Sequence, residues 1–449
     1  MTKESHRSVV PDEHSIADLE SLLRKSMGED LVVQKQTCID LLPPGENYGS
    51  LILKVDATIK RDPKSDDEQE LHLIAKIPPA TQQQRDFFDS PFTFKKESFM
   101  YDTILPTYKR FERDCGIDEE ETFDIGPKFY GSRLSLSAGE EFDDNAVILM
   151  ENLKVRGFYT GDRYLGLDLD HSRLAVEAMA RFHALGIAMK IKDPEFFAIL
   201  RVRSKCLELT NPEEWEDAMK VMYRTIEEDS VVGEHYDRCL GAMKAGGNEC
   251  WVAVPEEPWS TIIHADFWVN NIMFHRDEKN GRPDDVKFVD FQNYLFLSPT
   301  RELTFFLGSA CWRRKDPMCF TLDFGISLMG TLNGGGCKTE RFTTIGKKNR
   351  RYFFFFLIDN RSLQQSKKKI IGIFFLIEVF DESLLFIFLE NAYIEFSNLA
   401  FVLKIITKRA DVDDLESRNL NSVLATEDSE MFYARIRDLV NGYVKRRWL

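Results

Sequence analysis

The fold of this chain is decided by the stretch Ile263-His264-Ala265-Asp266-Phe267-Trp268-Val269-Asn270-Asn271-Ile272-Met273-Phe274. A second block downstream reads Phe288-Val289-Asp290-Phe291-Gln292. The two blocks stand at the ends of apolar, strand-like runs at 261–264 and 286–291. We expect these two strands to pair in a small hairpin-like element, so that the polar side chains of the loops gather at one end of it.

These polar side chains have the types and spacing that phosphoryl transfer needs. The reaction requires one carboxylate that takes the proton of the acceptor hydroxyl, and oxygen ligands that hold Mg²⁺ against nucleotide phosphates. We assign Asp266 as the catalytic base, and Asn271 and Asp290 as the magnesium ligands. The alternative is an ordinary loop, but the Asn five residues after the Asp and the downstream Val-Asp-Phe together favour catalysis. His264 is expected to hold the loop backbone.

Lys76 lies inside the apolar run Leu73-Ile74-Ala75-Lys76-Ile77. A buried lysine is costly unless it is paired. Glu97 follows in the next helical stretch and is the expected partner, because a Lys–Glu pair of this kind orients the α- and β-phosphates in kinases. The alternative is a lysine that faces solvent on an edge strand.

A weaker glycine signal lies upstream, where Gly45 and Gly49 flank a short turn that contains Asn47. Its backbone N–H groups are candidates for contact with phosphates, although a plain hairpin turn explains the residues almost as well. The pattern GxxxxGK[ST] is absent from the sequence, which excludes a P-loop enzyme.

A possible edge for adenine lies at the end of a strand-like run, in Met150, Glu151 and Leu153. The backbone there offers the donor and acceptor that adenine requires. The alternative is a strand end at which Asn152 acts as a cap.

Composition limits the class of protein. The net charge is −15, which argues against a nucleic-acid binder that works by phosphate neutralisation. Hydrophobic residues make up 43% and charged residues 30%, as in folded proteins. The longest apolar runs, 353–358 and 370–377, are too short to span a membrane. With a polar N-terminus and no zinc-like cysteine spacing, we expect a cytoplasmic protein that binds neither nucleic acid nor membrane.

The first third of the chain is β-rich and the rest is helical. Periodicity predicts a helix over 15–27 capped by Ser15, strands over 31–40, 50–60 and 71–77, a helix from about 94 that ends at Pro106, and strands over 128–131 and 146–150. Helices then dominate 174–250 and 381–449. We therefore expect an α+β protein with an N-terminal nucleotide-binding lobe over 1–150 and a catalytic and substrate-binding lobe over 151–449.

Residues 331–378 do not fit this outline. They contain ten Lys or Arg against three acidic residues, within an acidic chain. Runs of glycine and phenylalanine give them low complexity without a helical or strand period. The interpretations are a basic patch, a disordered insertion or, as we favour, translated non-coding sequence from a retained intron or a gene-model error.

The motifs together resemble those of the insect ecdysteroid-kinase-like family, within the choline-kinase and aminoglycoside-phosphotransferase group. The residues that carry the resemblance are Phe94-x-x-Glu97-x-Phe99-x-Tyr101, Leu149-Met150-Glu151-Asn152-Leu153, His264 to Asn271, Val289-Asp290-Phe291-Gln292 and Phe182-His183-Ala184-Leu185. The resemblance covers about 31–329 and resumes near 380. Ala265 stands where the family usually has glycine, and Glu302 where it usually has aspartate.

The resemblance implies a bilobal protein-kinase-like fold, with a small antiparallel β-sheet in the N-lobe and a mostly helical C-lobe. It also implies ATP and Mg²⁺ as cofactors and a hydroxyl on a small molecule, most directly an ecdysteroid, as acceptor. The alternatives are a kinase acting on choline or a xenobiotic, a protein kinase, and an inactive binding module or mis-spliced product. A protein kinase is disfavoured because no Ala-Pro-Glu follows Asp290 at activation-loop distance.

Overall fold

The computed structural model describes residues 15–41, 49–64, 66–206, 212–252, 260–311, 382–407 and 429–446. Outside these ranges it describes only 255, 257, 449 and three short strands. Contacts divide the chain into two compact units. The first contains the described residues within Met1–Asp102 and Pro127–Gly157, and the second those within Thr103–Gly126, Phe158–Arg409 and Arg418–Leu449. The segment Thr103–Gly126 therefore belongs to the second unit, although it precedes residue 150.

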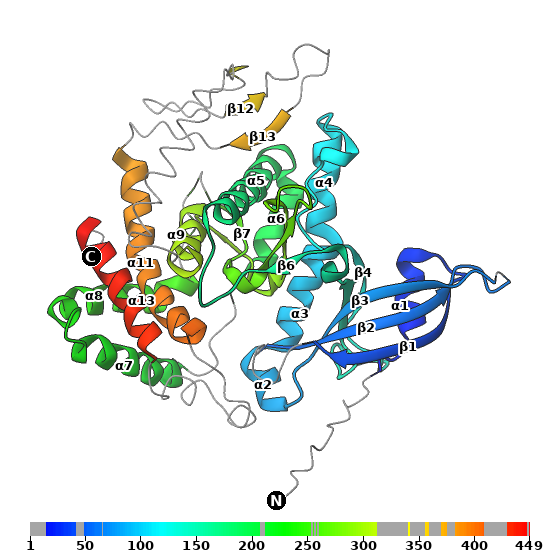
Figure 1. The fold of residues 1–449 in the computed structure, drawn as a ribbon, viewed down its shortest axis with the longest axis horizontal. Coiled ribbons are helices and arrows are strands. Elements are labelled where there is room, and N and C mark those ends of the chain that lie inside the picture. Colours follow the sequence, from blue (N-terminus) through cyan, green and yellow to red (C-terminus); the bar gives the residue numbers. More distant parts are fainter. Residues whose placement is uncertain are drawn as a thin grey trace, which may run out of the picture. The chain divides into compact units, whose positions relative to one another are not determined.

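The first unit is built on a five-stranded antiparallel sheet in the order β1-β2-β3-β5-β4. Its strands are β1 (Val32–Asp40), β2 (Leu51–Lys60), β3 (Gln69–Ile77), β4 (Phe129–Arg133) and β5 (Val147–Glu151). All five coincide within two residues with the strands predicted from the sequence. The sheet also confirms the predicted α+β class, because the second unit is mostly helical (Figure 1).

Helix α1 (Leu19–Met27) packs against one face of this sheet. Leu22 and Leu23 are buried there with Leu53, Val55 and other strand residues. The predicted start at Ser15 is wrong, because the helix begins after Asp18. The N–H and the carbonyl of the buried Ile16 each form a hydrogen bond of 3.1 Å with the side-chain amide of Gln36. These backbone groups are therefore not available for an earlier helical turn.

A helical stretch follows through α2 (Gln82–Phe87), α3 (Ser90–Phe99), a π-helical turn (Met100–Ile104) and α4 (Leu105–Asp114). The predicted stop at Pro106 is wrong. Pro106 lies in the first turn of α4, directly after the wider π-helical turn. At that position the missing N–H of proline costs little, so the chain continues as helix for two more turns.

The second unit is mostly helical, as predicted. Besides α4, its described helices are α5 (Leu169–Lys192), α6 (Pro194–Arg203), α7 (Pro212–Glu228), α8 (Tyr236–Val252), α9 (Pro299–Ala310), α11 (Glu382–Thr407) and α13 (Glu430–Arg446). Figure 1 shows α11 beside α13 and beside α8. Apolar side chains from α7, α8, α9, α11 and α13 form one shared core around Phe396 and Leu399.

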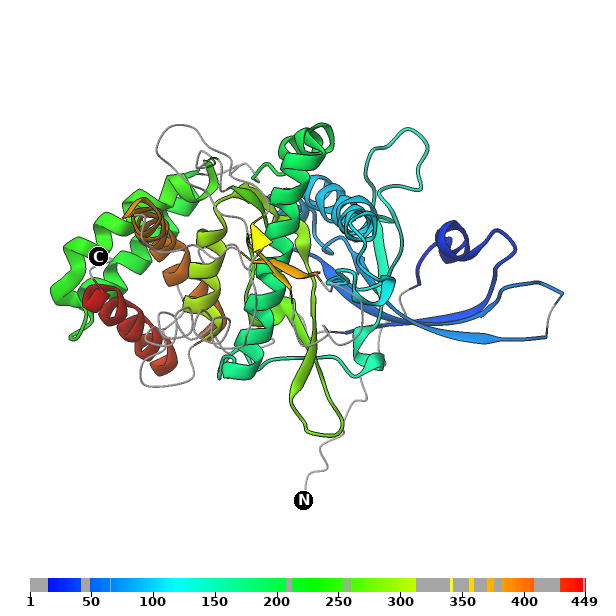
Figure 2. The same ribbon diagram turned by 90° about the horizontal axis from the view of Figure 1, so that it is seen from above.

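The strands of the second unit pair differently from our expectation. β7 (Thr261–Ile263) pairs with β10 (Leu295–Leu297), while β9 (Pro283–Phe288) pairs with β8 (Ile272–Arg276), which also pairs with β6 (Tyr159–Thr160). The β8–β9 hairpin is the yellow-green pair of ribbons in Figure 2. The predicted pairing of 261–264 with 286–291 is wrong, because the apolar run after Asn271 forms a strand of its own and takes β9 as its partner.

The predicted insertion at 331–378 lies largely outside the described residues. Three short strands are described within it, β11 (Glu340–Arg341), β12 (Phe355–Ile358) and β13 (Ile370–Phe374), and they pair in that order. In the described part of the chain, no helix combines the length and apolar character needed to cross a membrane.

Candidate active site

The loop after β7 carries the predicted catalytic base. His264 is fully buried, and Ala265 has the left-handed backbone conformation, with φ of 64°. The N–H of Ala265 donates to Glu302 Oε1 at 2.7 Å. A short 3₁₀ turn, Val269–Asn271, then returns the chain toward Asp266 before β8 begins. The loop is therefore fixed from both sides of Asp266.

Asp266 and Asn271, five residues apart, are in direct contact. The Nδ2 of Asn271 donates to the backbone oxygen of Asp266 and to its Oδ2, each at 2.9 Å. Asn271 is almost fully buried. Because its amide nitrogen is committed to Asp266, its amide oxygen is the group that can bind a cation.

Asp290 follows β9 and is joined to the same loop through the backbone. The N–H of Val289 donates to the carbonyl of Asn271 at 3.0 Å, and His264 Nε2 contacts the carbonyl of Val289 at 2.9 Å. Asp290 has a left-handed conformation, with φ of 63°, which aspartate tolerates better than most residues. An amide oxygen and a carboxylate so linked are the hard oxygen donors that Mg²⁺ takes together with phosphate oxygens.

His264 has the expected structural role of holding the loop backbone. Its ring is buried, and burial lowers its pKa, against the opposing effect of the Glu302 carboxylate. A neutral ring whose Nε2–H donates to Val289 connects the loop after β7 with the segment that carries Asp290.

In the first unit, Lys76 and Glu97 form the predicted ion pair. Lys76 Nζ lies 2.6 Å from Glu97 Oε2, and the two side chains are 2% and 1% exposed. Strand alternation explains the direction of the lysine. Leu73 and Ala75 of β3 face the core shared with α1, so Lys76 points to the opposite face, where α3 carries Glu97.

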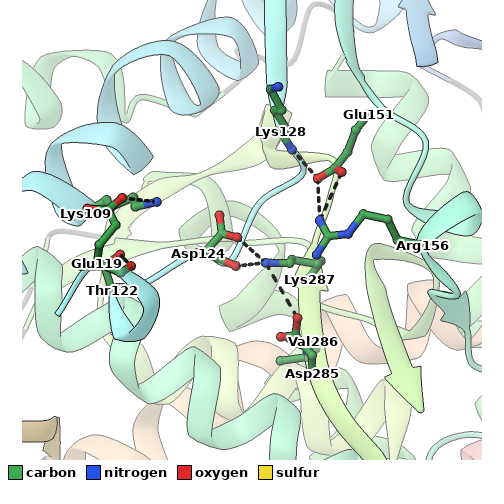
Figure 3. Close-up of polar contacts among 10 residues, drawn as sticks. All are labelled: Lys109, Glu119, Thr122, Asp124, Lys128, Glu151, Arg156, Asp285, Val286 and Lys287. Atoms are coloured by element: carbon green, nitrogen blue, oxygen red, sulfur yellow. Dashed lines mark hydrogen bonds and ion pairs between the residues drawn. The ribbon is translucent and has the colours of Figure 1, made fainter. Parts of the chain in front are cut away.

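The predicted nucleotide edge lies at the end of β5. Met150 and Leu153 are buried, while the side chain of Glu151 is engaged locally (Figure 3). Its carboxylate accepts the N–H of Lys128 at 2.7 Å and pairs with Arg156 at 3.1 Å, and the Glu151 N–H donates to the carbonyl of Lys128 at 2.9 Å. The side chain and the N–H of Glu151 are therefore engaged within the first unit, and other backbone groups of this segment remain the candidates for an adenine contact.

The glycine signal is only partly described. Gly45 and Asn47 lie outside the described residues, while Gly49 is buried two residues before the start of β2. The predicted contact of this turn with phosphates stays a prediction.

Lys287 of β9 was not predicted as part of the site. It is 2% exposed, and its Nζ contacts the backbone oxygen of Asp124 and, at 2.8 Å, the Asp124 carboxylate (Figure 3). The N–H of Phe288 also donates to the carbonyl of Ile125 at 2.7 Å. These contacts fix the end of β9, two residues before Asp290. A lysine inside the run Val286-Lys287-Phe288 was the signal in the sequence.

Among the solved structures that resemble this chain are phosphotransferases at low identity. Spectinomycin phosphotransferase APH(9)-Ia, in complex with ADP and spectinomycin, has 11% identity and a TM-score of 0.41, covering 96% of this chain and 98% of that one. Plasmodium vivax ethanolamine kinase has 10% identity and a TM-score of 0.35, covering 96% and 87%. APH(3'')-Id from Streptomyces rimosus has 14% identity and a TM-score of 0.29, covering 70% and 91%.

A search of curated proteins finds no match. The model of the ecdysteroid kinase-like family matches residues 44–314, which is more than half of the chain and includes Lys76, Glu97, Asp266, Asn271 and Asp290. The chain therefore belongs to the ecdysteroid kinase-like family.

Proposed function

We propose that this protein is an ATP-dependent phosphotransferase that transfers the γ-phosphoryl group to a hydroxyl of a small molecule, with an ecdysteroid as the leading acceptor. The observation that carries the proposal is the contact of Asn271 with Asp266, joined through the backbone to Asp290. An ordinary loop does not require a buried amide such as Asn271 to hold the carboxylate of Asp266. Nor does it require a second carboxylate, Asp290, at the end of the neighbouring strand β9.

In this proposal Asp266 is the catalytic base. As the acceptor oxygen forms its bond to the γ-phosphorus, the carboxylate takes the hydroxyl proton, the bond from the γ-phosphorus to the bridging oxygen breaks, and ADP leaves. The hydrogen bond from Asn271 fixes Oδ2 of Asp266, and so orients the carboxylate before the acceptor arrives.

The remaining residues would position the nucleotide. Asn271 and Asp290 would hold Mg²⁺, which neutralises charge on the phosphate oxygens when bound. Lys76, braced by Glu97, would orient the α- and β-phosphates. The backbone of Met150, Glu151 and Leu153 would offer adenine its hydrogen-bonding edge.

The choice of acceptor rests on membership of the family. A kinase that acts on choline or on a xenobiotic is the second candidate, because the motifs also resemble those of the choline-kinase and aminoglycoside-phosphotransferase group. The proposal retains the predicted cytoplasmic location, where ATP is abundant.

A transfer assay with Mg²⁺-ATP and a panel of ecdysteroids, choline and aminoglycosides tests the proposal, with mass spectrometry to detect the phosphorylated product. We expect Asp266→Asn to lose about 10²- to 10⁴-fold in rate while it still binds ADP in calorimetry. Asp277→Asn, in the exposed turn between β8 and β9, is the matched control and should keep full activity. Full activity in Asp266→Asn would contradict the assignment of the base.

A further inference from the structure

Three side chains of the second unit form a chain of hydrogen bonds that the proposed phosphoryl transfer does not use. The hydroxyl of Tyr159, in β6, lies 2.7 Å from His171 Nε2, in α5. On the other side of the ring, His171 Nδ1 lies 2.5 Å from Oδ1 of Asp168. The order is that of a hydroxyl, a base and an acid that orients the base, which is the arrangement by which proteins convert a hydroxyl into a nucleophile.

The base of this chain is held in place by its own helix. Asp168 is the N-cap of α5, and the oxygen that contacts the ring also accepts the backbone N–H of His171 at 3.0 Å. The ring stands edge-on to Phe274, with 4.8 Å between the ring centroids, and Phe274 is the strand partner of Tyr159. With Nδ1–H donated to the carboxylate, Nε2 is the atom that accepts the hydroxyl proton of Tyr159.

The oxygen of Tyr159 also has a cation beside it. Arg276, at the end of β8, donates to this oxygen from Nε at 3.3 Å and from Nη2 at 3.1 Å. A guanidinium is always charged, so these two donors stabilise the negative charge that develops on the oxygen when the proton leaves. Tyr159 is partly exposed and Arg276 is exposed, so the cluster lies at the surface, where a molecule from solvent can approach it.

The cluster lies away from the candidate active site. Strand β8 begins directly after Asn271 and ends at Arg276. A strand rises about 3.3 Å per residue, so the Cα atoms of these two residues are roughly 15 Å apart. The chain of hydrogen bonds is therefore a second group of reactive side chains in the described part of this unit.

We propose that Tyr159 is an acyl-accepting nucleophile and that the cluster is a second reactive site, which takes activated esters such as aryl acetates. The oxygen of Tyr159 forms a bond to the carbonyl carbon of the ester while its proton passes to His171 Nε2. The bond from that carbon to the aryl oxygen breaks, and the aryloxide leaves. Asp168 stabilises the imidazolium, which then gives its proton to water.

This site does not depend on phosphoryl transfer. The competing explanation is that the three side chains only anchor the two-residue strand β6 to α5. That explanation predicts a Tyr159 hydroxyl with the reactivity of any other tyrosine that lies beside an arginine.

The chain contains a matched control for this comparison. The hydroxyl of Tyr164 accepts a hydrogen bond of 2.9 Å from Arg163, whose Cζ lies 5.0 Å from the centroid of the Tyr164 ring. The Cζ of Arg276 lies at the same distance from the ring centroid of Tyr159. Both tyrosines are partly exposed, and Tyr159 differs by its bond to His171.

The test treats the full chain with p-nitrophenyl acetate in the absence of ATP. Absorbance follows the release of p-nitrophenol, and peptide mass spectrometry follows the acetylation of Tyr159 and Tyr164. We expect Tyr159 to react about 10²-fold faster than Tyr164, with a burst of about one equivalent of p-nitrophenol. Tyr159→Phe should abolish the burst.

Two variants test the base. In His171→Gln, acetylation of Tyr159 should fall by about 10²-fold, to the rate of Tyr164, because an amide cannot take up the proton. Asp168→Asn removes the acid but retains a good helix cap, so it remains a test if His171→Gln does not fold. It should slow Tyr159 by about tenfold or more and leave Tyr164 unchanged.

Equal rates at Tyr159 and Tyr164 in the wild-type protein would overturn the proposal, and this result does not depend on the folding of any variant. A fast reaction at Tyr159 that persists in folded His171→Gln, or in folded Asp168→Asn, would overturn it as well, because the histidine would then not be the base.

Discussion

Asn271 holds Asp266 by two hydrogen bonds from one amide nitrogen, to the backbone oxygen and to Oδ2 of the carboxylate, each of 2.9 Å. This relationship gives one residue two tasks in the proposed reaction. Its nitrogen orients the base, and its oxygen remains to bind the cation that accompanies the nucleotide.

Asn271→Ala should therefore impair both tasks. We expect the transfer rate to fall by about 10²-fold or more, because a misplaced base loses its alignment with the acceptor. The Mg²⁺ concentration needed for half-maximal rate should rise as well. A magnesium titration of the initial rate measures both effects. Asn280→Ala, in the exposed turn before β9, serves as the control, and a wild-type magnesium requirement in Asn271→Ala would show that Asn271 is not a ligand.

The buried pair Lys76–Glu97 should be essential for stability as well as for nucleotide binding. Lys76→Met leaves the Glu97 carboxylate buried without its lysine, which should cost about 3–5 kcal/mol in the free energy of unfolding. The double variant Lys76→Met/Glu97→Gln should recover part of this loss but none of the ADP affinity. Denaturant unfolding and calorimetry measure the two quantities.

The exposed pair Lys95–Glu141 provides the control for that experiment. Its side chains are 43% and 88% exposed and 2.8 Å apart. Solvent screens such a pair, so Lys95→Met should leave stability and ADP binding unchanged. Equal losses from the two lysine variants would mean that burial of the Lys76–Glu97 pair has no special effect.

Ala265→Gly should stabilise the protein. The left-handed conformation costs a residue with a Cβ about 1–2 kcal/mol, and glycine avoids this cost. The greater freedom of glycine in the unfolded chain offsets about 0.5–1 kcal/mol of the gain. We expect the free energy of unfolding to rise by about 0.5–1 kcal/mol, with the transfer rate unchanged. Ala175→Gly, inside α5, should instead destabilise. A less stable Ala265→Gly would show that the loop is not strained there.

Acidification should destabilise the fold through His264. Burial lowers the pKa of this ring in the folded protein, whereas the unfolded chain takes up the proton near the ordinary value of about 6.5. Below that pH the unfolded state binds more protons, so stability falls as the pH drops. Chemical unfolding at several pH values should show a shallower decline in His264→Gln than in the wild type. Parallel profiles would contradict a buried neutral ring.

Deletion of residues 331–378 should leave the second unit folded. Helices α9 and α11 on either side of it contact each other directly: Arg301 pairs with Glu395 at 2.6 Å, and a Cβ at Gly308 would lie 2.6 Å from the side chain of Leu399. We expect a soluble protein with cooperative unfolding and full transfer activity. Gly308→Leu, which disrupts the contact between the helices, should lower stability in both forms. An insoluble deletion variant would show that 331–378 is part of the fold.

Local patterns predicted most of the elements. Strand-like runs predicted the five strands of the first unit, helical periodicity predicted α5, and composition and pattern predicted helices over 193–250 and 381–449, whereas α9 was not predicted. The errors occurred where a distant contact or an irregular helical turn overrides a local preference. Gln36 delays the start of α1, and a π-helical turn carries the chain past Pro106.

The candidate site also has features that follow from the sequence and features that depend on the tertiary structure. The sequence by itself determined which residue types would carry the proposed chemistry: a lysine in an apolar strand must find a carboxylate, and His-x-Asp with a later Asn and Val-Asp-Phe would provide oxygens for a base and a cation. Only the tertiary structure decided which strands pair, that Glu302 reaches the Ala265 N–H, and that Lys287 supports the loop of Asp290. The reason is physical: spacing along the chain determines the face of a helix or strand on which a side chain lies, whereas partners far apart in the sequence are selected by packing and by the cost of leaving buried polar groups unsatisfied.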